Sequence, residues 1–229
     1  MFPRLDHKIT SDKQFAEKRF LVRSARLELD KDNCRNCGVC LNACPNDVIT
    51  RGAPGASIKT TGDQVMAGVL LDPDSCSYCG VCSYLCPFDA LTLFIDGEPV
   101  KDEKLQLVIK GALPELDAKE VQLLDGKKGK HFMDGHLEYD EDKCQSGCRT
   151  CTNLCPTGAL SFEKRDPWQV GEKFVIDRDA CIYCGACAFS CPSSAIKIFR
   201  DKIMIKGEFS DPFWPDIEKR LLIFHGTFE

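Results

Sequence analysis

The sequence predicts an α+β fold in which two small modules, each a pseudo-twofold βαβ repeat, are joined by a β-rich linker. Two observations support this prediction. The sixteen cysteines of the 229-residue chain form four quartets, and the same short apolar phrase with two aspartates precedes each quartet. The second and fourth quartets share the pattern Cys-x-Tyr-Cys-Gly-x-Cys, so the four units group two by two. A duplication of a duplication predicts two tandem modules rather than one large core.

Each quartet ends in Cys-Pro, and three of the four have the spacing C-x2-C-x2-C-x3-C-P, while the third has one extra residue in its first gap. This is the spacing of bacterial ferredoxins, whose cysteine thiolates hold iron–sulfur clusters. The sixteen cysteines therefore predict four [4Fe–4S] clusters with no cysteine left over. The quartets are Cys34, Cys37, Cys40 and Cys44; Cys76, Cys79, Cys82 and Cys86; Cys144, Cys148, Cys151 and Cys155; and Cys181, Cys184, Cys187 and Cys191.

The ligand assignment follows from the crossed pairing of two-cluster ferredoxins, in which the fourth cysteine of one run ligates the other cluster of the pair. An alternative pairs the second quartet with the third and the first with the fourth, but the duplication favours pairing within each half. The predicted sets are Cys34, Cys37, Cys40 and Cys86 (cluster 1); Cys76, Cys79, Cys82 and Cys44 (cluster 2); Cys144, Cys148, Cys151 and Cys191 (cluster 3); and Cys181, Cys184, Cys187 and Cys155 (cluster 4).

Three other interpretations of the cysteines fit the sequence less well. Disulfide domains are usually short and do not repeat a cysteine triplet followed by Cys-Pro. Tetrahedral zinc sites draw two C-x2-C pairs from separated segments. The spacing Cys144-x3-Cys148-x2-Cys151 matches the triad of radical S-adenosylmethionine enzymes. However, Cys155 supplies a fourth cysteine, and the chain lacks the long strand–helix alternation of a barrel.

Each repeat predicts a strand, a cluster loop, a short helix and a second strand. The aspartates that end the first strand favour a turn rather than a calcium or catalytic site. A short helical turn is expected after each Cys-Pro. The predicted first strands contain residues 27–29, 69–71, 137–139 and 174–176, and the predicted second strands begin near residues 48, 90, 159 and 195.

The units divide the chain into an N-terminal arm (1–26), a first module (27–100), a linker (101–136), a second module (137–200) and a C-terminal strand and helix (201–229). The arm holds seven Lys/Arg against three Asp/Glu, and a solvated arm is favoured over a docking element. The linker predicts a strand over residues 105–109, a turn at Pro114 and a lysine-rich loop at residues 126–130 that could form the tip of a hairpin.

The tail predicts a helix that opens at Pro215, with Ile217, Leu221 and Phe224 on one face. That face is expected to pack on its own module, with a partner subunit as the alternative for the aromatic residues.

Composition sets further limits. The formal charge is −5 without the clusters, and no basic, aromatic-interleaved surface is present, which argues against nucleic-acid binding. The opening residues lack a hydrophobic leader, and no apolar stretch reaches a spanning length, so we expect no membrane insertion and a cytoplasmic location. The four histidines form no ligand pattern. Each module is too small for a large apolar core, so folding should be coupled to cluster insertion.

The run from Cys86 to Leu93, Cys-Pro-Phe-Asp-Ala-Leu-Thr-Leu, followed by Ile95-Asp96-Gly97-Glu98, resembles the polyferredoxin subunit of formylmethanofuran dehydrogenase in methanogenic archaea. The stretch from Arg51 to Ala56 resembles it as well. The resemblance covers about residues 20–200. Members of that family carry about twice as many quartets, so this chain resembles half of one.

The resemblance implies low-potential electron delivery, within a large assembly, toward a tungsten- or molybdenum-pterin subunit that reduces carbon dioxide. Nothing in these residues binds pterin, methanofuran or carbon dioxide, and no catalytic residue is expected. The expected partners are other subunits of a redox complex and electron donor and acceptor proteins. The alternatives are a polyferredoxin of a hydrogenase- or molybdopterin-reductase-associated complex and a free soluble ferredoxin.

Overall fold

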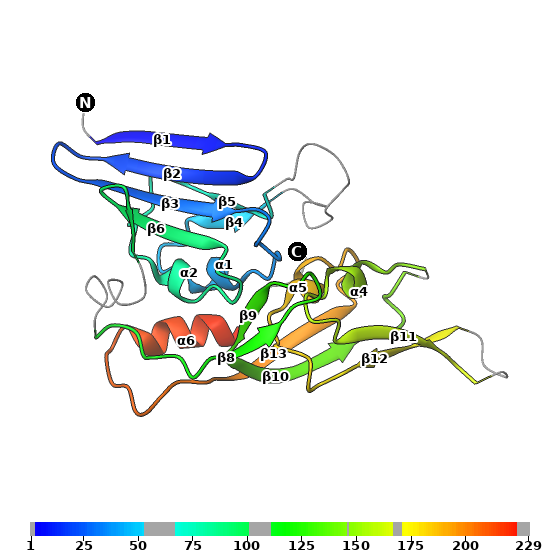
Figure 1. The fold of residues 1–229 in the computed structure, drawn as a ribbon. Coiled ribbons are helices and arrows are strands. Elements are labelled where there is room, and N and C mark those ends of the chain that lie inside the picture. The colour runs from blue at the N-terminus through cyan, green and yellow to red at the C-terminus, as the bar shows by residue number, and fades with distance from the viewer. Residues whose placement is uncertain (1–2, 53–66, 101–110, 146, 167–170, 224–229) are drawn as a thin grey trace.

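The computed structural model describes residues 3–52, 67–100, 111–145, 147–166 and 171–223, and its first half folds around two small antiparallel ladders (Figure 1). Strand β3 pairs with β6, and β4 pairs with β5. The predicted strands at residues 27–29 and 69–71 are thereby confirmed. The elements are β3 (Ser24–Asp30), α1 (Val39–Ala43), β4 (Ile49–Arg51), β5 (Val69–Leu71), α2 (Val81–Tyr84) and β6 (Leu91–Ile95).

The second half repeats this order and this pairing. Strand β10 pairs with β13, and β11 pairs with β12. The α+β class with few, short helices is confirmed. Every strand pairing in the described residues is antiparallel, and the finer description as pseudo-twofold βαβ repeats stays a prediction. The elements are β10 (Met133–Tyr139), α4 (Thr150–Leu154), β11 (Leu160–Lys164), β12 (Glu172–Ile176), α5 (Ala186–Phe189) and β13 (Ile196–Ile203).

The short helices lie before each Cys-Pro, so the prediction of a helical turn after it was wrong. Helix α1 contains Cys40, ends at Ala43, and is followed by Cys44 in an extended conformation with ψ 115°. A residue that precedes proline is driven out of the helical region by the proline ring, and proline has no N–H to continue the helix. The order of the repeat is therefore strand, loop, helix, Cys-Pro turn and strand.

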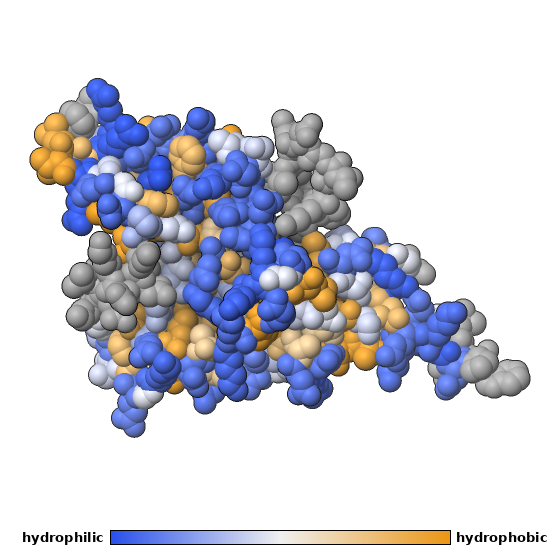
Figure 2. Space-filling model, in the orientation of Figure 1, coloured by the Kyte–Doolittle hydropathy of each residue, from blue (hydrophilic) through white to orange (hydrophobic). Residues whose placement is uncertain are grey.

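The N-terminal residues belong to the sheet of the first module and do not form a separate solvated arm. Strands β1 (Arg4–Ile9) and β2 (Lys13–Arg19) form a hairpin, and β2 pairs with β3. The side chains of Gln14 and Ala16 are fully buried, because alternate residues of β2 face the module. The side chains of β1 are exposed, and hydrophilic residues dominate the face of this hairpin that Figure 2 shows.

The linker contains the predicted hairpin, although its lysines lie differently from the prediction. Strands β8 (Lys119–Gln122) and β9 (Lys128–His131) flank a turn at residues 123–127, so Lys128 and Lys130 are in the strand and not at the tip. The lysines are also paired, since Lys130 Nζ donates to Asp89 at 2.6 Å and Lys127 Nζ to Asn33 at 2.7 Å. The hairpin is therefore attached to the first module. The predicted strand over residues 105–109 lies outside the described residues. A short strand β7 (Glu98–Pro99) pairs antiparallel with β6.

The C-terminal helix packs on both modules, whereas the sequence predicts packing on its own module alone. Helix α6 (Trp214–Leu222) buries Trp214, Ile217 and Leu221, and it lies beneath α1 of the first module as well as beside β13 (Figure 1). Arg220 Nε donates to the Asn42 carbonyl oxygen at 3.0 Å. The helix thus joins the two halves. Phe224 lies outside the described residues.

The core is continuous through both halves, and cysteines form a large part of it. Aliphatic side chains from the strands and from the short helices surround the thiols. None of the helices in the described residues has the length and hydrophobicity needed to span a bilayer.

Substitution of Leu221 tests the bridging role of α6. Leu221 is fully buried between the halves, so Leu221→Ala should lower the free energy of unfolding by roughly 2–5 kcal/mol. The matched control is Ile223→Ala, because the Ile223 side chain is exposed one residue beyond the helix. Anaerobic thermal unfolding followed by circular dichroism would measure both variants. Equal effects of the two substitutions would contradict the packing described here.

Candidate metal centres

The backbone of the four cysteine loops is built from left-handed residues at repeated positions. One lies directly before the second cysteine of each loop, and one lies three residues after the fourth cysteine. In the third loop the first position is a glycine within the longer gap. Such φ values are rare for non-glycine residues, so each loop has an unusual and specific path. The residues are Asn36, Tyr78, Gly147 and Tyr183 before the second cysteine, and Asp47, Asp89, Gly158 and Ser194 after the fourth.

Aspartates fix the entry into these loops, as the turn interpretation predicted. Asp30 Oδ1 accepts from the Asp32 N–H at 2.8 Å, and Asp72 Oδ1 accepts from the Asp74 N–H at 2.9 Å. Asp177 Oδ1 accepts from the N–H of residue 179 at 3.0 Å. Each aspartate therefore hydrogen-bonds to the backbone two residues later, which is the usual role of this side chain in a turn.

Three cavities of the structure are each lined by four cysteines from two different loops. Their volumes are about 410, 310 and 310 Å³, counting space open to solvent. In every case three cysteines come from one quartet and the fourth is the Cys-Pro cysteine of the neighbouring quartet. The lining cysteines are Cys44, Cys76, Cys79 and Cys82; Cys144, Cys148, Cys151 and Cys191; and Cys155, Cys181, Cys184 and Cys187.

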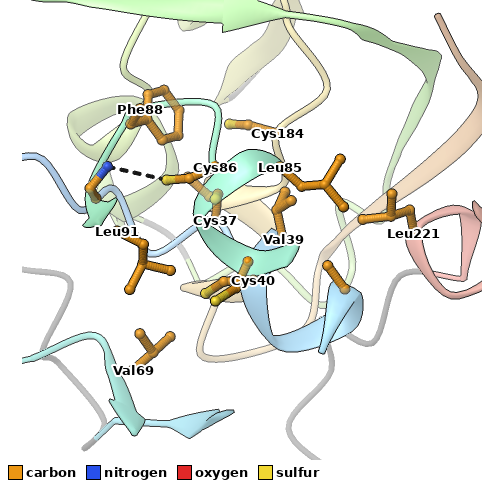
Figure 3. Close-up of a cluster of buried hydrophobic side chains, with 14 of the residues drawn as sticks. Cys37, Val39, Cys40, Val69, Leu85, Cys86, Phe88, Leu91, Cys184 and Leu221 are labelled. Carbon is orange, nitrogen blue, oxygen red and sulfur yellow. Dashed lines mark hydrogen bonds between the residues drawn. The ribbon is translucent and has the colours of Figure 1, made fainter. Parts of the chain in front are cut away.

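The remaining four cysteines also gather in one place. Cys37, Cys40 and Cys86 are buried together in the core and are labelled in Figure 3, and Cys34 lies at its edge. The charges of Cys34 and Cys86 both act on the Cys37 thiol. Three of the predicted ligand sets thus each line one cavity, and thiols of the remaining set are neighbours in the core. The assignment of the sixteen cysteines to four clusters stays a prediction.

Burial and mutual repulsion make these thiols hard to ionise in the absence of a cation. Burial raises the pKa of Cys76, Cys151 and Cys181 to about 11, and the pKa of Cys184 to about 12. Part of each rise in pKa comes from neighbouring thiolates, because like charges in a low-dielectric site repel each other. A soft, positively charged metal group removes both penalties, since the thiolate is the ligand form of cysteine. The donor set therefore fits iron.

Backbone N–H groups are directed at several of the sulfurs. The Ala90 N–H donates to Cys86 Sγ at 3.3 Å, which Figure 3 marks with a dashed line, and the Ala195 N–H donates to Cys191 Sγ at 3.3 Å. These bonds occupy equivalent positions in the two halves. Hydrogen bonds to ligand sulfur stabilise negative charge there and raise the reduction potential of a bound cluster.

The contact between the halves was not anticipated from the sequence. Gly38, beside Cys37, has φ 73°, and a Cβ on it would lie 2.7 Å from Cδ2 of Phe189 in α5. The guanidinium of Arg51, another residue of the first half, lies over the Phe189 ring, 3.7 Å from its centre. Phe189 is two residues beyond Cys187, so the loops of the first and fourth quartets meet here.

The model of the 4Fe–4S dicluster domain matches residues 14–90 and 143–195, which together make up more than half of the chain. This chain belongs to the 4Fe–4S dicluster domain family. It is an iron–sulfur electron-transfer protein of the ferredoxin type. The two matched segments coincide with the two halves of the fold.

Several curated proteins are similar to parts of the chain. One is NADH-quinone oxidoreductase subunit I of Pelobacter propionicus, 27% identical over 38% of this chain and 49% of its own length. Another is pyruvate synthase subunit PorD of Methanothermobacter marburgensis, 40% identical over 28% of this chain and 64% of its own. The match thus spans about half to two thirds of these relatives. Their names mark them as subunits of oxidoreductases, which fits a non-catalytic electron-transfer subunit.

A solved structure is similar over almost the entire chain. It belongs to a formate dehydrogenase–heterodisulfide reductase–formylmethanofuran dehydrogenase complex from Methanospirillum hungatei. The TM-score is 0.78 at 25% sequence identity, and the match covers 97% of this chain and 92% of that one. The neighbour is therefore of nearly the same length as this chain.

A substitution at Gly38 tests the close approach of the two halves. Gly38→Ala introduces both a strained left-handed alanine, costing about 1–2 kcal/mol, and a clash with Phe189 costing about 1–3 kcal/mol more. The matched control is Gly97→Ala, because Gly97 has φ 84° but no atom within 4 Å of its Cβ position. The free energies of unfolding of the two variants should therefore differ by the clash alone. Identical values would show that the halves are not in contact at Phe189.

Proposed function

We propose that this chain holds four [4Fe–4S] clusters and relays single electrons between other subunits of a redox complex. The observation that carries the proposal is the division of all sixteen thiols into four neighbouring groups, with the membership that crossed ligation requires. Each cluster, when bound, supplies a site that accepts and releases one electron.

The protein's own residues have distinct roles in this proposal. Three cysteines of a loop and the Cys-Pro cysteine of the neighbouring loop provide the four thiolates of each site. The aliphatic side chains around them exclude water, and the N–H donors of Ala90 and Ala195 stabilise negative charge on sulfur. The interlaced loops place two sites close together inside each half.

The third site also supports full ligation. Its cavity is lined by Cys191 in addition to Cys144, Cys148 and Cys151. A radical S-adenosylmethionine enzyme needs one iron without a protein thiolate, whereas here a fourth thiol is in place.

Pairs of cysteine substitutions test the crossed ligation. In the crossed arrangement Cys44 and Cys79 serve the same cluster, so Cys44→Ala and the double variant with Cys79→Ala should each lack one cluster. Cys44 and Cys37 serve different clusters, so that double variant should lack two. Iron and sulfide determination on anaerobically reconstituted protein measures the difference. Loss of two clusters in the Cys44/Cys79 pair, and of one in the Cys44/Cys37 pair, would indicate ligation within each quartet.

We further propose that the complex is of the kind that contains a formylmethanofuran dehydrogenase, and that the chain is located in the cytoplasm. The support is the solved neighbour from such a complex, which matches 97% of this chain, together with the resemblance in residues 86–98. A second candidate is another redox complex, because the curated relatives include subunits of NADH-quinone oxidoreductase and pyruvate synthase.

Isolation of the native assembly separates these candidates. Affinity purification of the tagged chain from its own organism under anaerobic conditions, followed by mass spectrometry, should recover a pterin-containing formylmethanofuran dehydrogenase. Recovery of quinone-reductase or pyruvate synthase subunits would favour the second candidate. Recovery of the chain alone as a monomer would instead indicate a free ferredoxin.

A further inference from the structure

The loop of the first quartet and the loop of the fourth quartet meet at the contact between the halves. The backbone of Gly38 packs directly on the Phe189 ring, and Arg51, which also belongs to the first half, lies over the same ring. The Cys37 thiol is adjacent to this contact. Figure 3 shows Cys184 of the second half beside Cys37 and Cys86 of the first.

The proximity of Cys37 and Cys184 is also electrostatic. Cys184 lies close enough to Cys37 for its charge to act on that thiol, as does Cys86 of the same predicted ligand set as Cys37. The two thiols belong to different predicted clusters, cluster 1 and cluster 4. The junction between the halves is therefore a junction between two metal sites.

Arg200 lies at this junction and is 3% exposed. Its Nε donates to the Tyr183 carbonyl oxygen at 3.0 Å, and its Nη2 donates to the Cys184 carbonyl oxygen at 2.5 Å. Its Nη1 donates to the Leu221 carbonyl oxygen of α6 at 2.9 Å. The guanidinium is thus bound to the fourth cysteine loop and to the helix that joins the halves, while the charges of Cys37, Cys184 and Cys187 act on it.

A buried guanidinium must be compensated, because taking an isolated charge out of water is costly and arginine does not lose its proton in proteins. A four-thiolate cluster is an anion, and it becomes more negative when it is reduced. A fixed cation close to two such clusters favours their reduced forms, and the effect is large where water is excluded.

We infer that Arg200 is the residue that tunes the junction, raising the reduction potentials of clusters 1 and 4 above those of clusters 2 and 3. This inference rests on the proposed function, since it presupposes bound clusters. It sets the order of the relay as cluster 2, cluster 1, cluster 4 and cluster 3. Because clusters 1 and 4 have the higher reduction potentials, an electron that crosses between the halves is most stable on these two inner clusters.

The exposure of the thiols agrees with this order. Clusters 2 and 3 each have two half-buried thiols, whereas cluster 1 has one, that of Cys34, and every thiol of cluster 4 is buried. Clusters 2 and 3 are therefore the ones that donor and acceptor proteins can approach. Clusters 1 and 4 lie toward the interior, where a buried charge has the greatest effect.

Substitution of Arg200 tests the inference with the iron-loaded protein. In Arg200→Gln, which keeps a hydrogen-bond donor but loses the charge, two of the four reduction potentials should fall. The expected change in the reduction equilibrium is at least tenfold, which is about 59 mV for a one-electron couple. Anaerobic potentiometric titration followed by electron paramagnetic resonance measures all four potentials. The two shifted signals should be those missing from Cys40→Ala and Cys187→Ala protein.

Two matched variants separate charge from structure. Arg200→Lys keeps the charge and loses the forked geometry, so its potentials should stay close to those of the parent protein. Arg220→Gln removes another interfacial arginine, whose carbonyl acceptors are those of Asn42 and Cys44, and it should leave clusters 1 and 4 unchanged. Equal shifts in the Lys and Gln variants, or four clusters with unmoved potentials in Arg200→Gln, would overturn the inference while the proposed function stands.

The junction can also be tested without a change at Arg200. Removal of cluster 4 by Cys187→Ala should shift the potential of cluster 1, because a neighbouring anion is lost. Removal of cluster 3 by Cys148→Ala should leave cluster 1 unchanged. The opposite pattern would show that the halves meet at a different pair of clusters.

Discussion

Groups of four thiols converge in the interior of a small protein, and such groups can ionise together only where a cation is shared among them. Burial, with a smaller contribution from the neighbouring Cys155 and Cys181, raises the pKa of Cys184 to about 12. The thiols are buried in one continuous core together with aliphatic and aromatic side chains from both halves. The thiol groups are therefore both the chemical site and the structural centre of each half.

The same constraint accounts for the architecture. In the proposed ligation each site takes its fourth cysteine from the neighbouring loop, so neither loop of a half would complete a site alone. The two halves are then joined by α6 and by the hairpin β8–β9, which bring together regions far apart in the sequence. The contact at Gly38 and Phe189 places the inner sites side by side. The proposed linear order of the redox sites is consistent with this packing.

The sequence was sufficient for the elements that depend on local pattern. Cysteine spacing, the aspartate turns and the short apolar phrases predicted the strands and the loops in the right order. The contact between the halves was not predictable, because spacing does not say which faces of two modules meet. One feature of the sequence does indicate that Arg200 is buried. It lies on the same side of the strand as Ile196 and Ile198, whose side chains face inward. The prediction of a solvated arm was wrong for the hairpin β1–β2. Its many charged residues indicated exposure, although Gln14 and Ala16 face inward.

Mössbauer spectroscopy of the anaerobically isolated, iron-57-labelled protein, together with iron and sulfide determination, tests whether every cysteine is a ligand to iron in a four-thiolate cluster. We expect one iron and one sulfide for each cysteine, with all iron in the [4Fe–4S] form. Zinc in place of iron, or a share of the cysteines in disulfides, would contradict it.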